Sequence, residues 1–387
     1  MNVPIRLAAR MRVIVALTAI LAGSLGTAAQ TPDQAKVPGV VIAHSPQASG
    51  MYIGSPSVAV LADGSYVASH DLFGPKAGEA EHAITRVFRS TDRGTTWQQT
   101  TELRGQFWGS LFVHRGDLYI MGTSATHRHG HCVIRKSLDG GRTWTEPTDK
   151  NNGLLFGDLS YTTAPVPVIV HQGRIWRAME DEKDPGGWGD SFRAFMMSAS
   201  VNGDLLRADS WTSSNSVSHD KAHWTGNAWL EGNAVVDPDG NMVDILRVGA
   251  PEVAAIVRIS ADGRKATFDP NHDFIHFHGG NTKFTIRHDA TTGRCWSLVN
   301  KQRDPTAARN RLVLVSSTNL RDWTVEKLLL EHPDSAKHAF QYVDWLFEGD
   351  DIIAVSRTAY DDGMGGAHNA HDANYLTFHR FERFRTR

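Results

Sequence analysis

Side chains able to bind or transform a charged sugar recur along the chain at the ends of predicted strands. Arginine and lysine pair with carboxylates, aromatic rings stack on sugar rings, and histidine, tyrosine or carboxylate groups move protons. The candidates are His70, His82, Tyr161, Arg177, Trp229, Glu231, Arg247, His278, Lys283 and Arg357. If the fold brings them to one place, they form a site suited to an acidic oligosaccharide or polysaccharide.

Two histidine-rich segments raise the alternative of a metal site. Histidines alternate in 127–131, and His368 and His371 precede Asp372. Neither segment has the helical i, i+4 spacing and defined carboxylate partner of strong zinc motifs. We therefore expect no metal site and no cofactor, and expect the second segment to order a glycine-rich loop, while a structural cation stays an open alternative.

A repeated sequence pattern indicates which secondary structure positions these residues. Ser90–Trp97 and Ser137–Trp144 both read S-x-D-x-G-x-T-W, 47 residues apart. In this pattern the Asp carboxylate accepts backbone N–H bonds, Gly takes a positive φ, and Trp packs beneath the turn. Each stretch therefore closes a β-hairpin, and a hairpin period of roughly 40–60 residues is typical of a β-propeller.

Six hairpins of two apolar strands can be counted, and remnants of the repeat follow at Ser200, Ser260 and Ser317. The hairpins turn at Gly64, Gly116, Gly173, Gly240, Gly293 and Gly349. The sixth lacks a following repeat, as expected if Val41–Ala43 supplies its outer strand beside Tyr375–Phe381 and closes the ring. These features predict an all-β propeller of six blades in a single domain over residues 30–387, with the polar candidates on the face opposite the hairpin turns.

The N-terminus and the composition limit the function classes. Arginines at 6, 10 and 12, an apolar run over 13–21 and small residues at 26–29 predict a secretory signal peptide over residues 1–29. The run is too short for a membrane span, so we expect a periplasmic or secreted protein. A net charge of −2 argues against nucleic acid as a partner. We expect a monomer that binds a carbohydrate.

The repeats resemble the Asp boxes of sialidases, and the segment 56–68 resembles the opening blade of that family. Trp229–Asn233 with Arg247 is similar to the sialidase glutamate and second arginine. However, Gly54-Ser55-Pro56 stands where the family has Arg-Ile-Pro. Losing one of three carboxylate-binding arginines costs roughly 1.5–3 kcal/mol, so exo-sialidase activity is kept as an alternative.

A better resemblance is to bacterial propeller enzymes that act at rhamnose–uronate linkages. It is carried by residues 54–57 and 68–71, 161–165, 174–181, 340–345 and 372–375. The resemblance implies an exported glycoside hydrolase, an α-L-rhamnosidase acting on rhamnosyl-glucuronate, with His70 as the catalytic histidine. Some of these enzymes have seven blades, and an extra blade would have to lie between Trp211 and Lys221.

The same resemblance leaves a lyase open. Propeller ulvan lyases look to use two histidines, a tyrosine and an arginine, for which the matches are His70, His82, Tyr161 and Arg177. Such a lyase neutralises the uronate carboxylate, removes the C5 proton and protonates the leaving oxygen. A propeller that binds glycans without chemistry is the remaining alternative, since Asp boxes occur in such proteins too.

Overall fold

The computed structural model describes Met1 and residues 31–183, 187–189, 191–302 and 308–386. The chain divides into two units, Met1–Thr31 and Pro32–Arg387, and every strand among the described residues belongs to the second. The predicted signal peptide, apart from Met1, lies outside the described residues and stays a prediction. Within the described part of the chain, no helix is long and apolar enough to cross a membrane.

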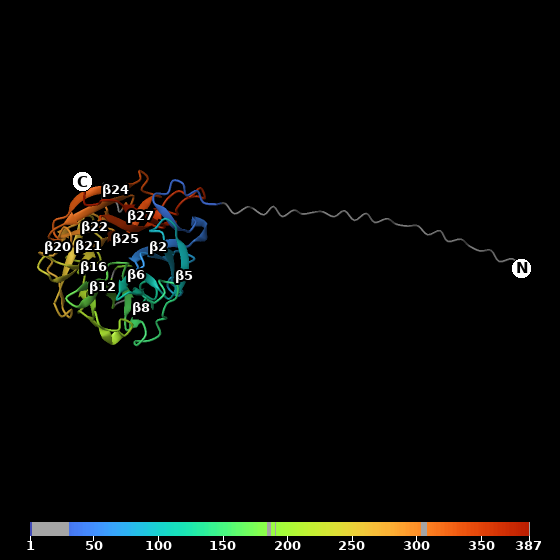
Figure 1. Ribbon diagram of the computed structural model, residues 1–387. Coiled ribbons are helices and arrows are strands. Elements are labelled where there is room, and N and C mark those ends of the chain that lie inside the picture. Colours follow the sequence, from blue (N-terminus) through green and yellow to red (C-terminus); the bar gives the residue numbers. More distant parts are fainter. Residues whose placement is uncertain (2–30, 184–186, 190, 303–307, 387) are drawn as a thin grey trace. The chain divides into compact units, whose positions relative to one another are not determined.

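Six antiparallel sheets follow one another along the chain, and the colours of Figure 1 run once around the ring that they form. This arrangement confirms the predicted all-β propeller of six blades. The first blade comprises β2 (Tyr52–Val60), β3 (Tyr66–Phe73), β4 (Ile84–Ser90) and β5 (Gln98–Arg104). The second comprises β6 (Phe107–His114), β7 (Asp117–Thr123), β8 (Cys132–Ser137) and β9 (Leu154–Phe156). The third comprises β10 (Ser160–Thr162), β11 (Ile169–His171), β12 (Arg174–Glu182), β13 (Phe192–Ser200), β14 (Trp211–Ser213) and β15 (Val217–Ser218).

Blades four to six complete the ring. The fourth blade comprises β16 (Leu230–Val236), β17 (Met242–Arg247), β18 (Val253–Ile259), β19 (Ala266–Thr267) and β20 (Phe274–His276). The fifth comprises β21 (Thr285–Asp289), β22 (Arg294–Asn300), β23 (Arg311–Ser317) and β24 (Thr324–Glu331). The sixth comprises β25 (Ala339–Glu348), β26 (Asp351–Ala359) and β27 (Tyr375–Phe381), together with β1 (Val40–His44). Two short 3-10 helices, η1 (Gln47–Ser49) and η2 (Ala208–Ser210), lie in connections.

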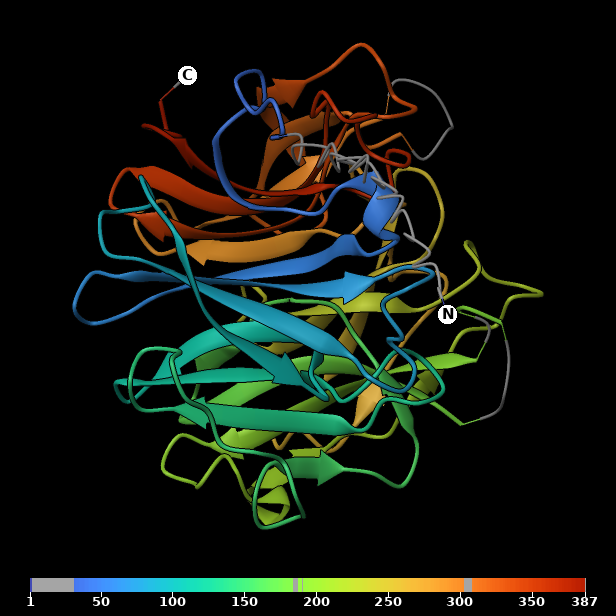
Figure 2. The ribbon, with the colours of Figure 1, turned by 90° about the vertical axis from the view of Figure 1, so that its right-hand side faces the viewer.

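The sixth blade takes its outer strand from the beginning of the unit, because β1 pairs antiparallel with β27. Figure 2 shows the first blade, in blue, between the sixth in red and the second in cyan. The segment suggested for a seventh blade, 211–221, does not form one. Its strands β14 and β15 both pair with β13 and belong to the third blade.

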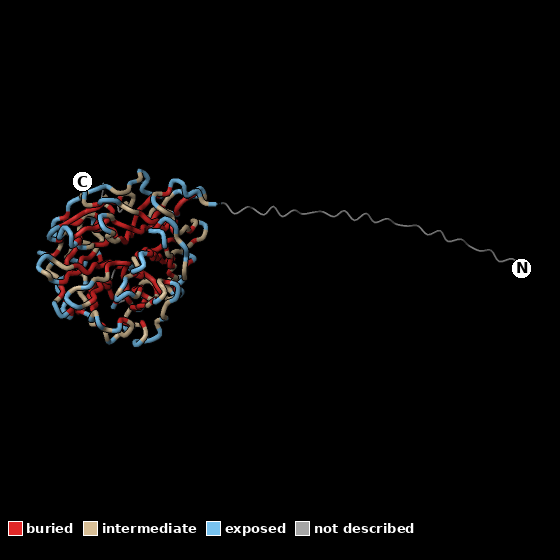
Figure 3. The backbone as a smooth tube through the Cα atoms, viewed as in Figure 1, coloured by how far each residue is buried: buried red, intermediate tan, exposed pale blue. Residues whose placement is uncertain are grey.

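The core lies between blades as well as within them. Val243 and Ile245 of β17 share one buried cluster with Ile286 of β21 and Val299 of β22, so the fourth and fifth blades bury each other's faces. Burial on both faces makes the inner strands nearly continuous in buried residues, as in β2 and β12. In Figure 3 the buried segments form the body of the ring and the exposed ones its loops.

The two Asp boxes have the turn geometry that their sequence predicts. The Asp92 carboxylate accepts the Thr96 amide at 2.9 Å and the Thr96 hydroxyl at 2.6 Å, and the Trp97 indole donates to the Gly94 carbonyl at 3.1 Å. Asp139, Thr143 and Trp144 repeat these bonds in the next blade. Bonds from Thr96 lower the pKa of Asp92 to about 2. The carboxylates of both boxes are thus bonded within their own turns.

Candidate active site

The inner strands of four blades share one irregularity near their start, because the pairing of β2, β6, β16 and β25 with the next strand shifts register. In the bulges of β6, β16 and β25, one residue other than glycine has a positive φ. These residues are Trp108 at 48°, Glu231 at 57° and Tyr342 at 55°. A bulge changes where a side chain points, and left-handed backbone is strained for residues other than glycine. Such strain concentrates at functional sites, which makes these three positions the starting point.

Tyr342 and Glu231, from blades six and four, meet directly. The Tyr342 hydroxyl donates to Glu231 Oε1 at 2.9 Å, and Arg247 Nη1 lies 3.0 Å from Glu231 Oε2. Burial lowers the pKa of Arg247, but the neighbouring Glu231 more than compensates and raises it above its usual value. The ion pair holds Glu231 ready to accept a proton from the phenol.

Two more arginines flank the same tyrosine. The Arg309 and Arg357 guanidinium carbons lie 5.4 and 4.9 Å from the centre of the Tyr342 ring. Burial lowers the pKa of Arg357 to about 10, so Arg357 stays charged at neutral pH, and burial also lowers the pKa of Arg309. They contact a side-chain amide and a backbone carbonyl, and within the described ranges neither is ion-paired with a carboxylate. Three guanidinium groups thus accompany the carboxylate of Glu231, and the surplus charge favours an anionic ligand.

A cavity of about 320 Å³ opens above this group, which we call the mouth cluster (Glu231, Arg247, Arg309, Tyr342 and Arg357). Aromatic and polar side chains make up most of its wall, the combination that suits a sugar ring. The mouth cavity is lined by Gly54, Ser55, Phe73, Glu79, Phe107, Trp108, Thr126, His127, Trp188, Tyr342, Arg357 and His371.

Glu79 adds a second carboxylate to the mouth cavity. It lies in the loop between β3 and β4, is partly exposed, and accepts the Gly74 amide at 3.3 Å through Oε1. A carboxyl group that reaches the cavity from a different blade than Glu231 can serve as an acid towards a bound sugar.

Gly54 stands where the sequence resemblance would place a sialidase arginine, and the structure gives a reason for glycine there. A Cβ on Gly54 would lie 2.7 Å from the Asp71 backbone oxygen, closer than real contacts allow. Arg357 from the neighbouring sixth blade lines the same cavity as Gly54, with its guanidinium 4.4 Å from the centre of the Phe73 ring. The guanidinium charge at this part of the cavity therefore comes from β26 instead of β2.

A larger cavity of about 830 Å³ lies on the face of the hairpin turns, among residues such as Gly240 and Gly293. Two of its polar side chains have partners within the protein. His171 Nε2 is 2.8 Å from the Gly240 carbonyl, and Arg287 is paired with Asp344 at 3.0 Å. We therefore assign the candidate site to the mouth cavity.

Of the ten residues predicted from the sequence, the structure brings Glu231, Arg247 and Arg357 together at Tyr342. Trp229 is fully buried, with its ring 4.8 Å from that of His219. Trp229 belongs to the buried cluster between the third and fourth blades and does not line the mouth cavity.

The four residues predicted to be catalytic are not brought together. His70 is fully buried, with Nδ1 2.8 Å from the Asp71 carbonyl, and burial lowers its pKa to about 4. Tyr161 is buried and donates to Asp158 at 2.6 Å, and Arg177 is buried on backbone carbonyls such as that of Ala164. His82 is three-quarters exposed on a loop. None of the four lines the mouth cavity, because the first three are enclosed between strands and His82 faces solvent.

The other two predicted binding residues have partners elsewhere. Lys283 is buried, donates to Thr285 Oγ1 at 2.6 Å and to the Val343 carbonyl at 2.9 Å, and burial lowers its pKa to about 8. His278 contacts Glu252 and lies in a separate cluster of side chains on the rim. Neither residue lines the mouth cavity.

Sequence reasoning missed Tyr342, Arg309 and Glu79. The direction of the Tyr342 side chain could not be predicted from strand alternation, because the register shift within β25 interrupts the two-residue period. Arg309 and Glu79 lie outside the strands, where periodicity gives no direction. One sequence feature could have pointed to the site: at Gln341-Tyr342 and at Glu231, a predicted inner strand begins with a polar residue.

No protein-family description matches the chain, and no curated protein matches it by sequence. Solved structures do resemble it. A Hadza microbial sialidase aligns with a TM-score of 0.61 at 14% identity, over 89% of this chain and 68% of that one. An α-L-arabinofuranosidase of Fusarium graminearum aligns at 0.58 and 11%, over 89% and 97%. A Dyadobacter fermentans protein of unknown function aligns at 0.60 and 13%, over 90% and 98%.

These similarities show the fold, a sialidase-like propeller of six blades. At such low identity they do not carry an activity over to this chain. The finer resemblance to rhamnosidases and ulvan lyases stays a prediction from the sequence.

Proposed function

We propose that the protein is a glycosidase that cleaves a glycosidic bond next to a sugar carboxylate, within the mouth cavity. One observation carries the proposal: the Tyr342 hydroxyl donates to Glu231 while three arginines surround the pair. A phenol bonded to a carboxylate is an activated nucleophile, and tyrosine is the nucleophile of sialidases.

The proposed reaction has two steps. First, the Tyr342 oxygen bonds to the anomeric carbon as the bond to the leaving oxygen breaks, Glu231 takes the phenolic proton, and Glu79 protonates the leaving oxygen. Second, water attacks the anomeric carbon, Glu79 takes its proton, and the Tyr342 oxygen leaves and recovers its proton from Glu231. The anomeric configuration is therefore retained.

A tyrosine nucleophile suits an acidic substrate. The approach of a carboxylate nucleophile to a sugar that bears its own carboxylate would be opposed by like-charge repulsion. A neutral phenol avoids this repulsion, and Arg309 and Arg357 are available to pair with the sugar carboxylate because neither is paired with one in the described residues. Each charge-assisted contact contributes about 1.5–3 kcal/mol.

Of the linkages that the sequence suggests, two place a carboxylate beside the cleaved bond. The sequence resemblance favours rhamnosyl-glucuronate, where the acid belongs to the leaving sugar. The tyrosine–glutamate pair among arginines favours a sialoside, where the acid is on the sugar that is attacked. The lyase alternative is less well supported, because its predicted residues His70, His82, Tyr161 and Arg177 do not meet at the mouth cavity.

A substrate panel tests the proposal. The purified protein is incubated with a rhamnosyl-glucuronate glycan, ulvan, sialyllactose and a neutral arabino-oligosaccharide, and products are followed by reducing-sugar release and near-ultraviolet absorbance. We expect new reducing ends from an acidic substrate without ultraviolet absorbance. An unsaturated product would mean elimination, and cleavage of the neutral glycan alone would overturn the proposal.

A further inference from the structure

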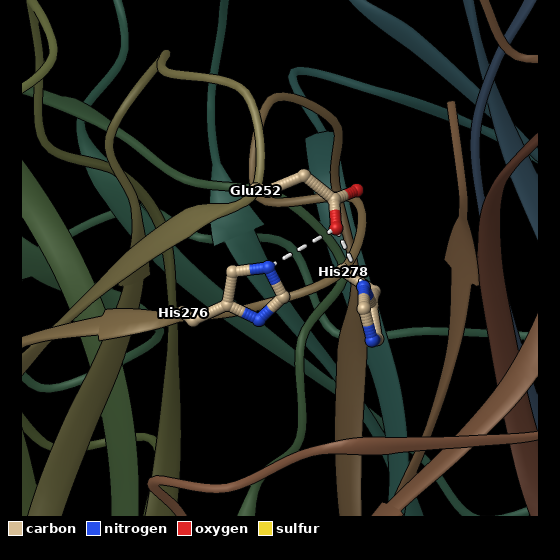
Figure 4. A group of neighbouring side chains, drawn as sticks. All are labelled: Glu252, His276 and His278. Carbon is tan, nitrogen blue, oxygen red and sulfur yellow. Dashed lines mark hydrogen bonds and ion pairs between the residues drawn. The ribbon is translucent and has the colours of Figure 1, made fainter. Parts of the chain in front are cut away.

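A second cluster of reactive side chains lies on the same face as the mouth cavity but does not line it. Glu252 follows β17 in the turn to β18, five residues after Arg247, and His276 and His278 lie at and just beyond the end of β20. Figure 4 shows both imidazole rings turned towards the Glu252 carboxylate. The three candidate ligand atoms all lie within 4.8 Å of one another.

The backbone holds these three residues in place. His276 pairs with Val253 in the sheet, and the Phe277 amide donates to the Glu252 carbonyl at 2.9 Å. Phe277 is fully buried in the core between blades four and five. His276 ends β20 and His278 begins the following turn, and with Phe277 buried between them their rings lie 4.8 Å apart on the side of Glu252.

Glu252 itself is held in an unusual conformation. Its φ is 55°, in the left-handed region that residues other than glycine rarely adopt. Such strain persists where the surrounding structure demands it, and it is concentrated at functional sites. Here the strained backbone places the carboxylate against two histidines from another connection.

From this geometry we propose that Glu252, His276 and His278 form a zinc-binding site on the rim of the propeller. Two imidazoles and one carboxylate are a donor set that zinc takes in open sites, whereas magnesium and calcium prefer oxygen alone. Ligands at about 2.0–2.1 Å in a tetrahedron lie about 3.3 Å apart. His276 Nε2 and Glu252 Oε2 are 3.4 Å apart, while His278 Nδ1, 2.5 Å from the same oxygen, must move outward to the same spacing.

The site already attracts a cation. The Lys301 ammonium lies 2.9 Å from His278 Nδ1 and 3.6 Å from Glu252 Oε2, where a metal ion would compete with it. Lys301 is about a quarter exposed and has a flexible side chain that can move into solvent. The His276 side chain is 63% exposed, so the fourth position of the ion would face solvent and accept water or a ligand oxygen.

Zinc titration of the chelator-treated protein tests the site, independently of any activity at the mouth cavity. Isothermal titration with zinc chloride and visible absorbance with cobalt chloride should both show one equivalent, the cobalt spectrum with tetrahedral bands. His276→Ala and Glu252→Gln should each weaken binding at least about 100-fold, since even indirect ligand partners contribute 10- to 100-fold. His276 is exposed and Glu252→Gln is nearly isosteric, so we expect both variants to fold.

Two further variants sharpen the test. Lys301→Met removes the competing ammonium and should tighten zinc binding about tenfold. His272→Ala is the matched control, because His272 is an exposed histidine paired with one carboxylate, Asp269, at 2.7 Å, and its loss should leave binding unchanged. The absence of stoichiometric binding, or binding that survives in both His276→Ala and Glu252→Gln, would overturn the proposal, as would weaker binding by Lys301→Met.

Discussion

Two neighbouring groups of residues contain similar chemistry but differ in access. The mouth cluster combines a carboxylate with arginines and reaches a cavity through Tyr342 and Arg357. The interior cluster, Arg177, Glu180 and Asp244, also combines carboxyl groups with an arginine but is enclosed in the ring, with each residue at most 1% exposed. The comparison shows that residue type alone does not determine which of the two clusters a substrate can reach; burial does.

The interior cluster supports the mouth cluster from below. Glu180 Oε1 accepts the Gly232 amide at 2.8 Å, directly after Glu231 in the bulge. Burial raises the pKa of Glu180 well above its usual value and that of Asp244 to about 8. Asp244 is therefore largely neutral near pH 7 and burial favours the neutral form of Glu180 as well, whereas Glu231 is paired with Arg247. The interior cluster thus holds the backbone of the bulge, while the mouth cluster lies at the cavity.

The largest expected effect comes from removing the nucleophile of the mouth cluster. Tyr342→Phe should lower kcat by at least about 1000-fold, because the variant lacks the phenolic oxygen that forms the proposed covalent intermediate. Initial rates on the acidic substrate identified by the panel provide the measurement. Tyr375→Phe is the matched control from the same blade, since the Tyr375 hydroxyl is buried with no bond partner in the described structure. Equal rates in the two variants would exclude Tyr342 from the reaction.

Arg357 should contribute mainly to binding of the carboxylate. Arg357→Met should lower kcat/KM for an acidic substrate about 10- to 100-fold, the equivalent of one charge-assisted contact. The same substrate with its carboxylate converted to an amide provides the comparison. A similar loss on both substrates would show that Arg357 acts on packing and not on charge.

The interior cluster should show itself in the pH dependence of stability. The pKa of Asp244 is about 8 in the folded chain, against about 3.8 for an ordinary Asp, so between these values only the folded state binds the proton. Asp244 thus makes the free energy of unfolding fall as pH rises from about 4 to 8, by at most about 1.4 kcal/mol per pH unit.

Denaturant unfolding at pH 5, 6 and 7.5 measures this slope. Asp244→Asn removes the titrating group and should flatten the decline relative to the wild type. An unchanged slope in this variant would assign the proton to another group, and a rise in stability with pH that depends on Asp244 would reverse the sign of our account.

The smallest effect is expected at the Asp boxes on the opposite face. Asp92→Ala removes bonds to Thr96 and should lower the Tm by about 2 °C, with kcat of the folded fraction unchanged. Calorimetry and initial rates check the two halves of this expectation. A loss of kcat with an unchanged Tm would connect the boxes to chemistry.

The propeller could be predicted from the sequence because its signals are local. The bonds of Asp92 and Asp139 lie within single turns, and each hairpin contributes one glycine turn. The site was only partly predictable. Glu231 lies in the sialidase-like segment 229–233, and Arg247 was matched together with it. In contrast, the position of the Tyr342 side chain is set by a bulge, and Arg309 lies in an irregular connection. His70 and Tyr161 have suitable chemistry, but their burial arises from packing between strands far apart in the chain.

Trapping the covalent intermediate tests the central claim most directly. The protein is treated with 2,3-difluorosialic acid and with 2-deoxy-2-fluoro-rhamnosyl fluoride, digested, and its labelled peptide is sequenced by mass spectrometry. Our account predicts one sugar equivalent on the Tyr342 oxygen from one of these reagents, and no label in Tyr342→Phe. A label on Glu231 or Glu79, or turnover of an acidic glycan with inverted anomeric configuration, would contradict it.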